Sequence, residues 1–477
     1  MDVLEFGTDG WRDVIADRFT YRNVARCAQA YAEHLLEAGQ DSVVVGYDTR
    51  FGGESFARLV AEVMAANGLT ALLSATFVPT PALSFAVTHF AAGGGVMLSA
   101  SHNPPQYNGL KVKGSYGGSA TDEVYRDVAA RVATTDDARV RRDKGSGKGL
   151  GSVEIVDIRP LYFQKLAELI DVETLRGVRG TLVHDAMGGA AAGWLSGFVH
   201  FTGLEVQVEQ LRKRPDPLFH GVNPEPLPPN MATTIARAQE GDLLFASATD
   251  GDGDRLGLVL PGGKFFNSHQ IFAVLLDLMQ RRGGSGRVVK TFTVSRLIER
   301  LAQRRGLEVV ETPVGFKHIV EKMLEGDVLI GGEESGGIGV AGHIPERDGI
   351  ANTLLILEAI ARSGMGLEEL FAGLEREADW HHAYDRADLH LESRSLTGAV
   401  MAALADPPQL IAGRPLTSVE TRDGVKLNLG DSAWLLVRAS GTEPLLRIYA
   451  EAPSADEVAT LLAQAKRFVA AVPVLKR

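Results

Sequence analysis

Residues 96–113, VMLSASHNPPQYNGLKVK, combine the end of a strand with a polar turn. The apolar residues 96–98 are typical of a buried strand. A turn follows, because Pro104 and Pro105 cannot continue a β-ladder and Asn-Pro favours a turn. Ser101 is therefore predicted to lie on a fixed loop at a strand end.

The chemistry of this loop depends on the hydroxyl of Ser101. An α/β sheet exposes reactive groups at the ends of its strands, and Lys111 and Lys113 follow within reach of the same loop. A hydroxyl on a stiff loop beside cations suits a covalently phosphorylated intermediate. An ordinary surface turn is the alternative, since Ser, Asn and Pro are common turn residues. Three further loops decide between the two interpretations.

Length and composition restrict the class of protein. The chain has 477 residues, too many for one hydrophobic core, so we expect three or four domains. A formal net charge of −11 without a basic run argues against nucleic-acid binding. Cys27 is the only cysteine, so no intrachain disulfide can form. We see neither a signal segment nor an apolar run of the roughly 18–20 residues that cross a bilayer, and we expect a cytoplasmic protein that binds no membrane.

The first 100 residues alternate between helical and strand patterns. Residues 21–38 are predicted to form a helix, 42–46 a strand rich in β-branched residues, and 55–66 a second helix. Thr80 and Pro81 open another helix as N-cap and N1 residues. This order predicts helices packed on a largely parallel sheet, and the pattern recurs along the chain as far as a final segment of different composition.

A second decisive loop, 249–255, reads TDGDGDR. Asp250, Asp252 and Asp254 alternate with glycines, so their oxygens can converge on a small hard cation such as Mg²⁺. An EF-hand is excluded, because the positions that need Gly and Glu hold Arg255 and Pro261. An acidic turn without a cation is the alternative, but three like charges this close would repel one another.

Two later loops carry groups that suit a sugar phosphate. In 331–337, GGEESGG, Glu333 and Ser335 offer acceptors and a donor for vicinal hydroxyls, although a flexible glycine loop explains the pattern equally well. In 438–444, RASGTEP, a turn made tight by glycine brings together donors that fit a phosphate dianion, with a β-hairpin as the alternative. These donors belong to Arg438, Ser440, Thr442 and Arg447.

The order and the sequences of these loops resemble those of the α-D-phosphohexomutase superfamily. SASHNP is similar to its phosphoserine loop, DGDGDR to its metal loop, GEESG to its sugar loop and RASGTEP to its phosphate loop. The resemblance extends from FGTDGWR, residues 6–12, to the end of the chain. It implies an α/β fold: three similar α/β domains with mixed, mostly parallel sheets, and a smaller C-terminal α+β domain, around a central cleft. We expect the domains at 1–150, 151–258, 259–378 and 379–477.

The resemblance also implies roles for individual residues. Ser101 would carry the phosphoryl group and bind Mg²⁺ through it, together with Asp250, Asp252 and Asp254. Arg12, Lys111 and His102 would complete the catalytic group, with a desolvated Lys111 as the candidate base. The implied substrate-binding residues are Arg255, Lys317, Glu333, Ser335, Arg438, Ser440, Gly441, Thr442 and Arg447.

The predicted function is a mutase that interconverts hexose 1-phosphate and hexose 6-phosphate through a hexose 1,6-bisphosphate, as a monomer or homodimer. TPVGFKHI, residues 312–319, is similar to phosphoglucomutase and phosphomannomutase members, so we expect glucose as the preferred sugar and mannose as a further one. A phosphoglucosamine mutase, a metal-dependent phosphatase and a non-catalytic sugar-phosphate sensor are alternatives. Gly337 stands where many relatives have a histidine, and His343 is either its replacement or a structural residue.

Overall fold

The computed structural model describes residues 4–7, 9–142, 151–404, 406–439 and 444–472. Two compact units are distinguished by their internal contacts. The first unit comprises Met1–Val289 and Gly315–Leu370, and the second comprises Lys290–Val314 and Phe371–Arg477. Ser440, Gly441 and Thr442 of the expected phosphate loop lie outside the described residues.

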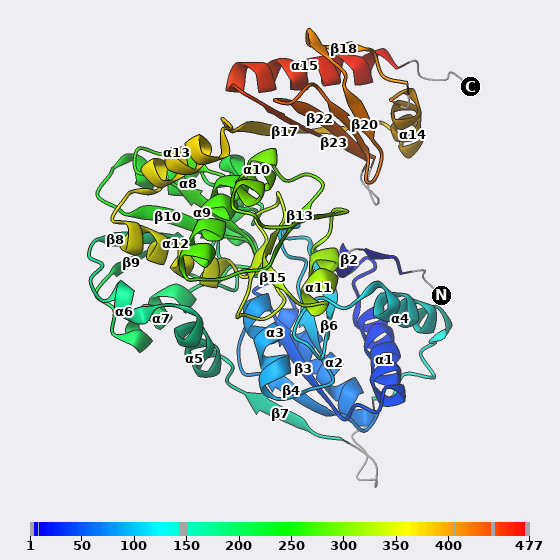
Figure 1. Ribbon diagram of the computed structural model, residues 1–477. Helices are drawn as coiled ribbons and strands as arrows, with labels where there is room; N and C mark the ends of the chain where they lie inside the picture. The colour runs from blue at the N-terminus through cyan, green and yellow to red at the C-terminus, as the bar shows by residue number, and fades with distance from the viewer. Residues whose placement is uncertain (1–3, 8, 143–150, 405, 440–443, 473–477) are drawn as a thin grey trace. The chain divides into compact units, whose positions relative to one another are not determined.

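The first sheet of the first unit has seven strands in the order β1-β2-β6-β5-β3-β4-β7. Figure 1 labels β2, β3, β4, β6 and β7 of this sheet. The neighbouring strands β5, β3, β4 and β7 run parallel to one another. The pairs β1–β2, β2–β6 and β6–β5 are antiparallel. The strands are β1 (Phe6–Gly7), β2 (Gly10–Val14), β3 (Ser42–Tyr47), β4 (Thr70–Ser74), β5 (Gly94–Leu98), β6 (Tyr107–Gly114) and β7 (Val153–Val156). Every residue of β5 is buried, as expected for a strand covered on both faces.

Four helices accompany this sheet: α1 (Tyr21–Glu37), α2 (Gly53–Ala66), α3 (Thr80–His89) and α4 (Asp122–Thr134). Helix α1 begins where the hydroxyl of Thr20 accepts a hydrogen bond from the N–H of Asn23 at 3.3 Å, a regular N-cap. Helix α3 begins one residue earlier than predicted, because its N-cap is Pro79 and not Thr80, and Pro81 lies in the first turn.

The second sheet has the order β12-β11-β10-β8-β9. Its strands are β8 (Thr181–Asp185), β9 (Gln207–Leu211), β10 (Phe245–Thr249), β11 (Leu256–Val259) and β12 (Phe265–Phe266). Strand β8 runs parallel to both β9 and β10, and β10 and β11 form an antiparallel pair joined by the loop of three aspartates. The helices of this segment are α5 (Arg159–Leu169), α6 (Val172–Leu175), α7 (Trp194–Thr202) and α8 (Ala232–Gln239).

The remainder of the first unit contains β15 (Val328–Gly332), its antiparallel partner β16 (Ile338–Val340), and the start of β13 (Arg287–Thr291). Its helices are α9 (Ser268–Arg281), α11 (Phe316–Leu324), α12 (Gly349–Ser363) and the start of α13 (Leu367–Ala378). No single helix in the described ranges is long and apolar enough to cross a membrane, although α12 and α13 pass that test as a bent pair. Most of α12 is buried inside the protein.

The second unit is built around an antiparallel sheet with the order β17-β23-β22-β21-β20. Its strands are β17 (Ala383–His390), β20 (Ser418–Glu420), β21 (Val425–Asn428), β22 (Trp434–Ala439) and β23 (Leu445–Ala452). A small hairpin is formed by β18 (Leu410–Ile411) and β19 (Arg414–Pro415). This unit also contains α10 (Arg296–Arg304), β14 (Val309–Thr312), α14 (Arg394–Ala403) and α15 (Ala455–Ala471).

Glu451 of β23 joins the two chain segments of the second unit. Its carboxylate is fully buried and accepts hydrogen bonds from the indole N–H groups of Trp380 and Trp434, at 3.1 and 2.6 Å, and from the backbone N–H of Arg296 at 3.0 Å. The Ser295 hydroxyl also donates to it.

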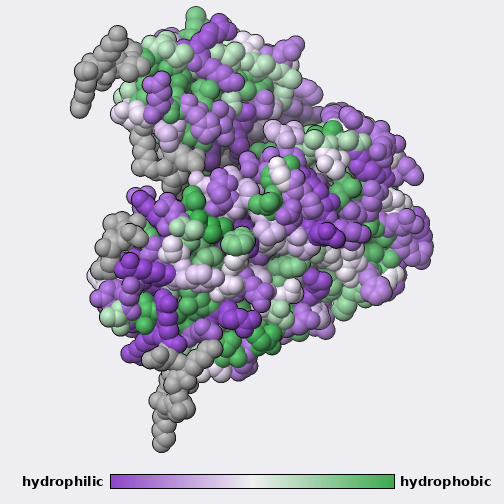
Figure 2. Space-filling view, turned by 180° about the vertical axis from the view of Figure 1, so that it is seen from behind, coloured by the Kyte–Doolittle hydropathy of each residue, from purple (hydrophilic) through white to green (hydrophobic). Residues whose placement is uncertain are grey.

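The predicted fold class is confirmed: mixed sheets with helices in three α/β segments precede an α+β segment. The four domain boundaries and the central cleft stay predictions. Strand β7 follows the boundary expected at residue 150 and still pairs with β4 of the first sheet. Likewise, β12 follows the boundary expected at 258 and pairs with β11 of the second sheet. On the face shown in Figure 2, hydrophilic residues predominate and hydrophobic ones form small separate groups.

Candidate active site

Ser101 lies in the loop between β5 and β6, in a conformation that favours glycine. Its φ is +52°, and its backbone N–H donates to the hydroxyl of Ser99 at 2.8 Å. A left-handed conformation at a non-glycine residue is strained, and such residues cluster at functional sites. The side chain is fully buried and its hydroxyl donates to Oδ2 of Asp250 at 2.7 Å. The serine loop and the carboxylate loop therefore meet, as the sequence predicted.

Arg50 holds the serine loop in this conformation, a role that the sequence did not reveal. Its guanidinium is buried beside the carboxylate of Asp48, with Nε 3.2 Å from Oδ2. The four backbone carbonyls that accept its N–H groups are those of Ser101 (2.6 Å), Asn103 (2.7 Å), Pro104 (2.9 Å) and Tyr107 (2.9 Å). One planar side chain thus fixes the loop from the serine to the start of β6.

Asp250, Asp252 and Asp254 form the loop from β10 to β11, and all three are fully buried. Each contributes a carboxylate oxygen to a group whose members lie within 4.8 Å of one another. Oδ1 of Asp250 accepts the backbone N–H groups of Asp254 at 2.9 Å and Arg255 at 3.1 Å, which closes the loop. A Cβ on Gly251 would lie 2.4 Å from the carbonyl oxygen of Ser101, so glycine permits the close approach of the two loops.

The donor set of this loop fits a divalent cation. Oδ1 of Asp252 and Oδ1 of Asp254 are buried and have no hydrogen-bond partner among the described residues. Burial, together with the charges of Asp254 and Asp252, raises the pKa of Asp250 well above its usual value. Buried carboxylate oxygens without partners are costly, and Mg²⁺ prefers such ligands.

Lys111 of β6 lies among the acidic groups. Its Nζ is 2.7 Å from Oδ2 of Asp252, 2.9 Å from Oδ2 of Asp9 and 3.5 Å from Oδ2 of Asp254. Burial lowers the pKa of Lys111, but attraction to these aspartates outweighs burial and raises the pKa above its usual value. A raised pKa favours the ammonium form of Lys111, which suits it to hold anionic oxygens. Its role as a base stays a prediction.

Arg12 and His102 also lie beside the serine loop. Arg12 of β2 donates to Oδ1 of Asn103 at 2.9 Å, and its Nη2 lies 3.4 Å from Oδ2 of Asp9. Nδ1 of His102 lies 3.5 Å from Oγ of Ser101. Both side chains thus lie close to the serine loop, and their catalytic roles stay predictions.

The expected sugar loop begins at the end of β15. Glu333 is buried, its Oε1 accepts the backbone N–H of Gly315 at 3.1 Å, and burial raises its pKa. Ser335 lies two residues further, in a partly exposed turn. The metal and sugar loops are adjacent, because the backbone N–H of Leu256 donates to the carbonyl of Gly336 at 3.1 Å.

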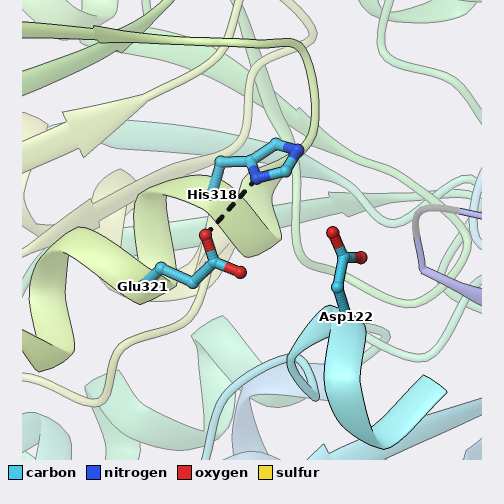
Figure 3. Close-up of side chains that lie close together, drawn as sticks. All are labelled: Asp122, His318 and Glu321. Carbon is cyan, nitrogen blue, oxygen red and sulfur yellow. Dashed lines mark hydrogen bonds and ion pairs between the residues drawn. The ribbon is translucent and has the colours of Figure 1, made fainter. Parts of the chain in front are cut away.

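Lys317 lies in the first turn of α11 and forms an ion pair with Asp122 of α4. Figure 3 shows Asp122 facing His318 and Glu321 of the same helix α11. Their ligand atoms lie within 4.8 Å of one another. We assign no metal to this group, because the ammonium of Lys317 already compensates Asp122.

Arg347 is the main site residue that sequence reasoning missed. It is buried before the start of α12, with Nη2 2.7 Å from Oδ2 of Asp254 and 3.0 Å from Oδ2 of Asp9. Its Nη1 lies 3.6 Å from Oε2 of Glu333. Arg347 thus connects the carboxylate loop to the sugar loop. The signal in the sequence was a charged run, PERDG at 345–349, placed directly before a helix.

His343 does not take the place of the histidine that is absent at Gly337. Its side chain is only 1% exposed, and Nε2 lies 2.7 Å from Oδ2 of Asp348, the N-cap residue of α12. Tyr162 donates to the same carboxylate oxygen. These contacts give His343 a structural role at the start of the helix.

The remaining predicted residues lie in two places. Arg255 follows the aspartates, with Nη1 3.7 Å from Oε1 of Glu225. In the second unit, Arg438 of β22 stands opposite Arg447 of β23 in the antiparallel register. Arg438 donates to Oδ1 of Asp423 at 2.9 Å, while Nε of Arg447 is buried without a partner in the described ranges.

Comparisons with known proteins agree with this arrangement. The phosphoglucomutase/phosphomannomutase descriptions for α/β/α domains I, II and III match residues 3–139, 160–263 and 267–377, and the one for the C-terminal domain matches 390–467. These matches define an isomerase of the phosphotransferase type within the α-D-phosphohexomutase superfamily. The chain belongs to the phosphoglucomutase/phosphomannomutase family.

Named relatives span almost the full length of the chain. A phosphoglucomutase/phosphomannomutase of Thermococcus kodakarensis is 31% identical over 456 residues, 95% of each chain. A phosphoglucosamine mutase of Bifidobacterium longum is 30% identical and covers 96% of this chain and 97% of its own. Among solved structures, a Thermus thermophilus protein provisionally described as a phosphomannomutase is 46% identical, with a TM-score of 0.88 over 98% of this chain and 99% of that one.

Proposed function

We propose that this enzyme interconverts hexose 1-phosphate and hexose 6-phosphate through a phosphorylated Ser101, with glucose preferred and mannose as a further substrate. The observation that carries the proposal is the 2.7 Å hydrogen bond from the Ser101 hydroxyl to Asp250. It joins a strained nucleophile loop to a buried carboxylate trio suited to a divalent cation. A phosphoryl carrier requires a nucleophile beside a site for a charge-neutralising cation.

The proposed reaction consists of two phosphoryl transfers in opposite directions. In the first, the bond from phosphorus to Oγ of phosphorylated Ser101 breaks, and phosphorus bonds to the free hydroxyl oxygen of the hexose monophosphate. That hydroxyl loses a proton and Oγ of Ser101 gains one. The resulting hexose 1,6-bisphosphate reorients within the site. Its other phosphoryl group is then transferred to Ser101 by the reverse exchange. Added bisphosphate would therefore prime an unphosphorylated enzyme.

The residues divide this chemistry among them. When bound by Asp250, Asp252 and Asp254, Mg²⁺ would supply charge neutralisation at the transferring group. We propose that protonated Lys111, with Arg12, binds the phosphoryl oxygens, and that His102, at 3.5 Å, exchanges the proton of the Ser101 hydroxyl.

Substrate recognition is proposed for the remaining residues. Glu333 and Ser335 would hold the sugar hydroxyls, and Lys317 and Arg255 would contact the other side of the sugar. In the second unit, the turn carrying Arg438 and Arg447 would bind the phosphate that is not transferred, together with Ser440, Gly441 and Thr442.

A phosphoglucosamine mutase is the second candidate. Relatives of that name, such as the Bifidobacterium longum protein, match nearly the full chain at 30% identity. The segment TPVGFKHI favours glucose and mannose, because phosphoglucosamine mutases usually have Asp-Arg after the Val-Gly. A direct comparison of substrates separates the two candidates.

The test compares the rates at which glucose, mannose and glucosamine 1-phosphates are converted to 6-phosphates, with Mg²⁺ and a trace of glucose 1,6-bisphosphate. We expect glucose 1-phosphate to react fastest, and Ser101→Ala to lose at least about a thousandfold in rate. The matched control is Ser196→Ala in α7, because the hydroxyl of Ser196 donates to the carbonyl of Gly193 at the start of its own helix at 3.4 Å. Full activity of Ser101→Ala would contradict the proposal. If glucosamine 1-phosphate is the best substrate, the second candidate, a phosphoglucosamine mutase, is supported instead.

A further inference from the structure

Glu346 and Lys113 form a buried ion pair outside the group of predicted site residues. Both side chains are fully buried, and Nζ of Lys113 in β6 lies 2.5 Å from Oε2 of Glu346. The hydroxyl of Ser84 in α3 donates to the same oxygen at 3.1 Å. One carboxylate therefore ties β6 and α3 to the loop that precedes α12.

The other oxygen of Glu346 faces Arg347. Oε1 accepts the backbone N–H of Arg347 at 3.1 Å and lies 3.8 Å from its Nε. Glu346 consequently restrains both the main chain and the side chain of the next residue. With Lys113 holding Oε2, the carboxylate cannot rotate without breaking a buried contact.

Arg347 carries this restraint into the site. It reaches Asp254 at 2.7 Å and Glu333 at 3.6 Å, so one guanidinium contacts both a proposed metal ligand and a proposed sugar ligand. Groups that orient a metal ligand change metal affinity by about 10–100-fold when they are removed. A small displacement of Arg347 should therefore affect cation and sugar binding together.

We infer that Glu346, held by Lys113, is a positioning residue that orients Arg347 and thereby sets the affinity of the aspartate trio for its divalent cation and of the sugar loop for hexose phosphate. The inference rests on the proposed function for the sugar loop only. A buried ion pair adds little net stability over apolar residues of similar size, so its main effect is expected at the site.

The first measurement is calorimetric titration of the full chain with Mg²⁺, which does not depend on activity. Glu346→Gln and Lys113→Met remove opposite charges from the same pair. We expect each to weaken Mg²⁺ binding by about tenfold, because either change releases Arg347. A purely electrostatic effect would instead weaken binding in the first variant and strengthen it in the second, and that result would overturn the inference.

The matched control is Glu358→Gln in α12 of the same unit. Glu358 is fully buried and accepts from Nε of Arg282 at 2.8 Å and Nε of Arg362 at 2.7 Å, away from the site. We expect this variant to lower Tm and to leave Mg²⁺ affinity unchanged. An equal loss of Mg²⁺ affinity in Glu358→Gln would mean that general destabilisation, and not positioning, is measured.

The double variant Lys113→Met/Glu346→Gln guards against misfolding, because it leaves no buried charge unpaired. We expect it to fold, to bind Mg²⁺ about tenfold more weakly and to show a raised KM for glucose 1-phosphate. Mg²⁺ affinity and KM equal to those of the wild type would overturn the inference while the proposed function stands. A wild type that binds Mg²⁺ but converts no hexose phosphate would overturn the proposed function and leave the metal part of the inference intact.

Discussion

Arg347 occupies the space that a side chain at Gly337 would need. A Cβ placed on Gly337 would lie 2.2 Å from Cδ and 2.8 Å from Cγ of Arg347, and 3.5 Å from Oε2 of Glu333. The stem of Arg347, which comes from the loop before α12, fills this volume.

A methyl group at this position should therefore disturb the sugar loop. Gly337→Ala is expected to raise KM for glucose 1-phosphate about tenfold, because the stem of Arg347 must move away from Glu333. Gly366→Ala, where nothing lies within 4 Å of the added carbon, is the control and should be neutral. In an Arg347→Ala background the Gly337→Ala change should cost little, since the clash is gone. Additive losses in the double variant would contradict a clash between the two side chains.

The role of Arg50 predicts that a lysine cannot replace it. A lysine ammonium carries its donors on one nitrogen and cannot reach four carbonyls spread along the serine loop. Arg50→Lys is expected to lower kcat at least about a hundredfold, since Ser101 loses its fixed geometry. Arg58→Lys, at a side chain that is 55% exposed, should be indistinguishable from the wild type. A kcat within twofold of the wild type in Arg50→Lys would contradict the assigned role.

Removal of divalent cations should abolish turnover without unfolding the chain. With EDTA we expect activity to fall to background and to return on addition of Mg²⁺, because the phosphoryl group and the aspartate trio otherwise repel each other. Mg²⁺ should also raise Tm in the wild type, since it binds only the folded trio. Both effects should be lost in Asp252→Asn. Undiminished activity in EDTA would exclude a cation-dependent transfer.

Acid should destabilise the protein partly through His184 of β8. This side chain is buried, with Nδ1 3.0 Å from the hydroxyl of Ser247, and burial lowers its pKa to about 4. An unfolded histidine titrates near pH 6.5, so only the unfolded state takes up this proton between the two values. The stability contributed by neutral His184 is complete above about pH 6.5 and is lost as the pH falls towards 4, by up to about 3 kcal/mol.

The measurement is the difference in Tm between the wild type and His184→Asn at pH 7.5 and at pH 5. Asparagine does not titrate, so the advantage of the wild type should shrink at the lower pH. A difference that stays constant, or grows, between the two pH values would contradict the assignment.

The parts of the site that lie within one motif could be predicted from the sequence. Ser101 and the three aspartates each lie in a loop that follows a strand, so local pattern places them at the same kind of loop. The structure brings Ser101 and Asp250 into contact. The sequence also places Lys111 near them. It does not show in which direction the pKa of Lys111 is shifted. That property depends on three aspartates from two other loops, which no local pattern brings together.

The residues that hold the loops in place could not be predicted. Arg50 acts on carbonyls about fifty residues away, and Arg347 acts on Asp9 and Asp254 from the far end of the first unit. Arg50 binds backbone carbonyls, which every residue has, and Arg347 binds aspartates from distant parts of the chain. No sequence motif therefore links either arginine to its partners. In the same way, β7 and β12 join the sheets before them because the pairing partner, not the position in the chain, decides where a strand belongs.

The central claim is that Ser101 carries the phosphoryl group that is transferred. The most direct test is intact-protein and peptide mass spectrometry after brief incubation with glucose 1,6-bisphosphate and Mg²⁺, for the wild type and Ser101→Ala. We predict one added phosphoryl group, located on Ser101, which disappears when excess glucose 1-phosphate is supplied and the phosphoryl group passes to the sugar. Mutase turnover with no phosphoryl group on Ser101, or the same label on the Ser101→Ala variant, would contradict the account.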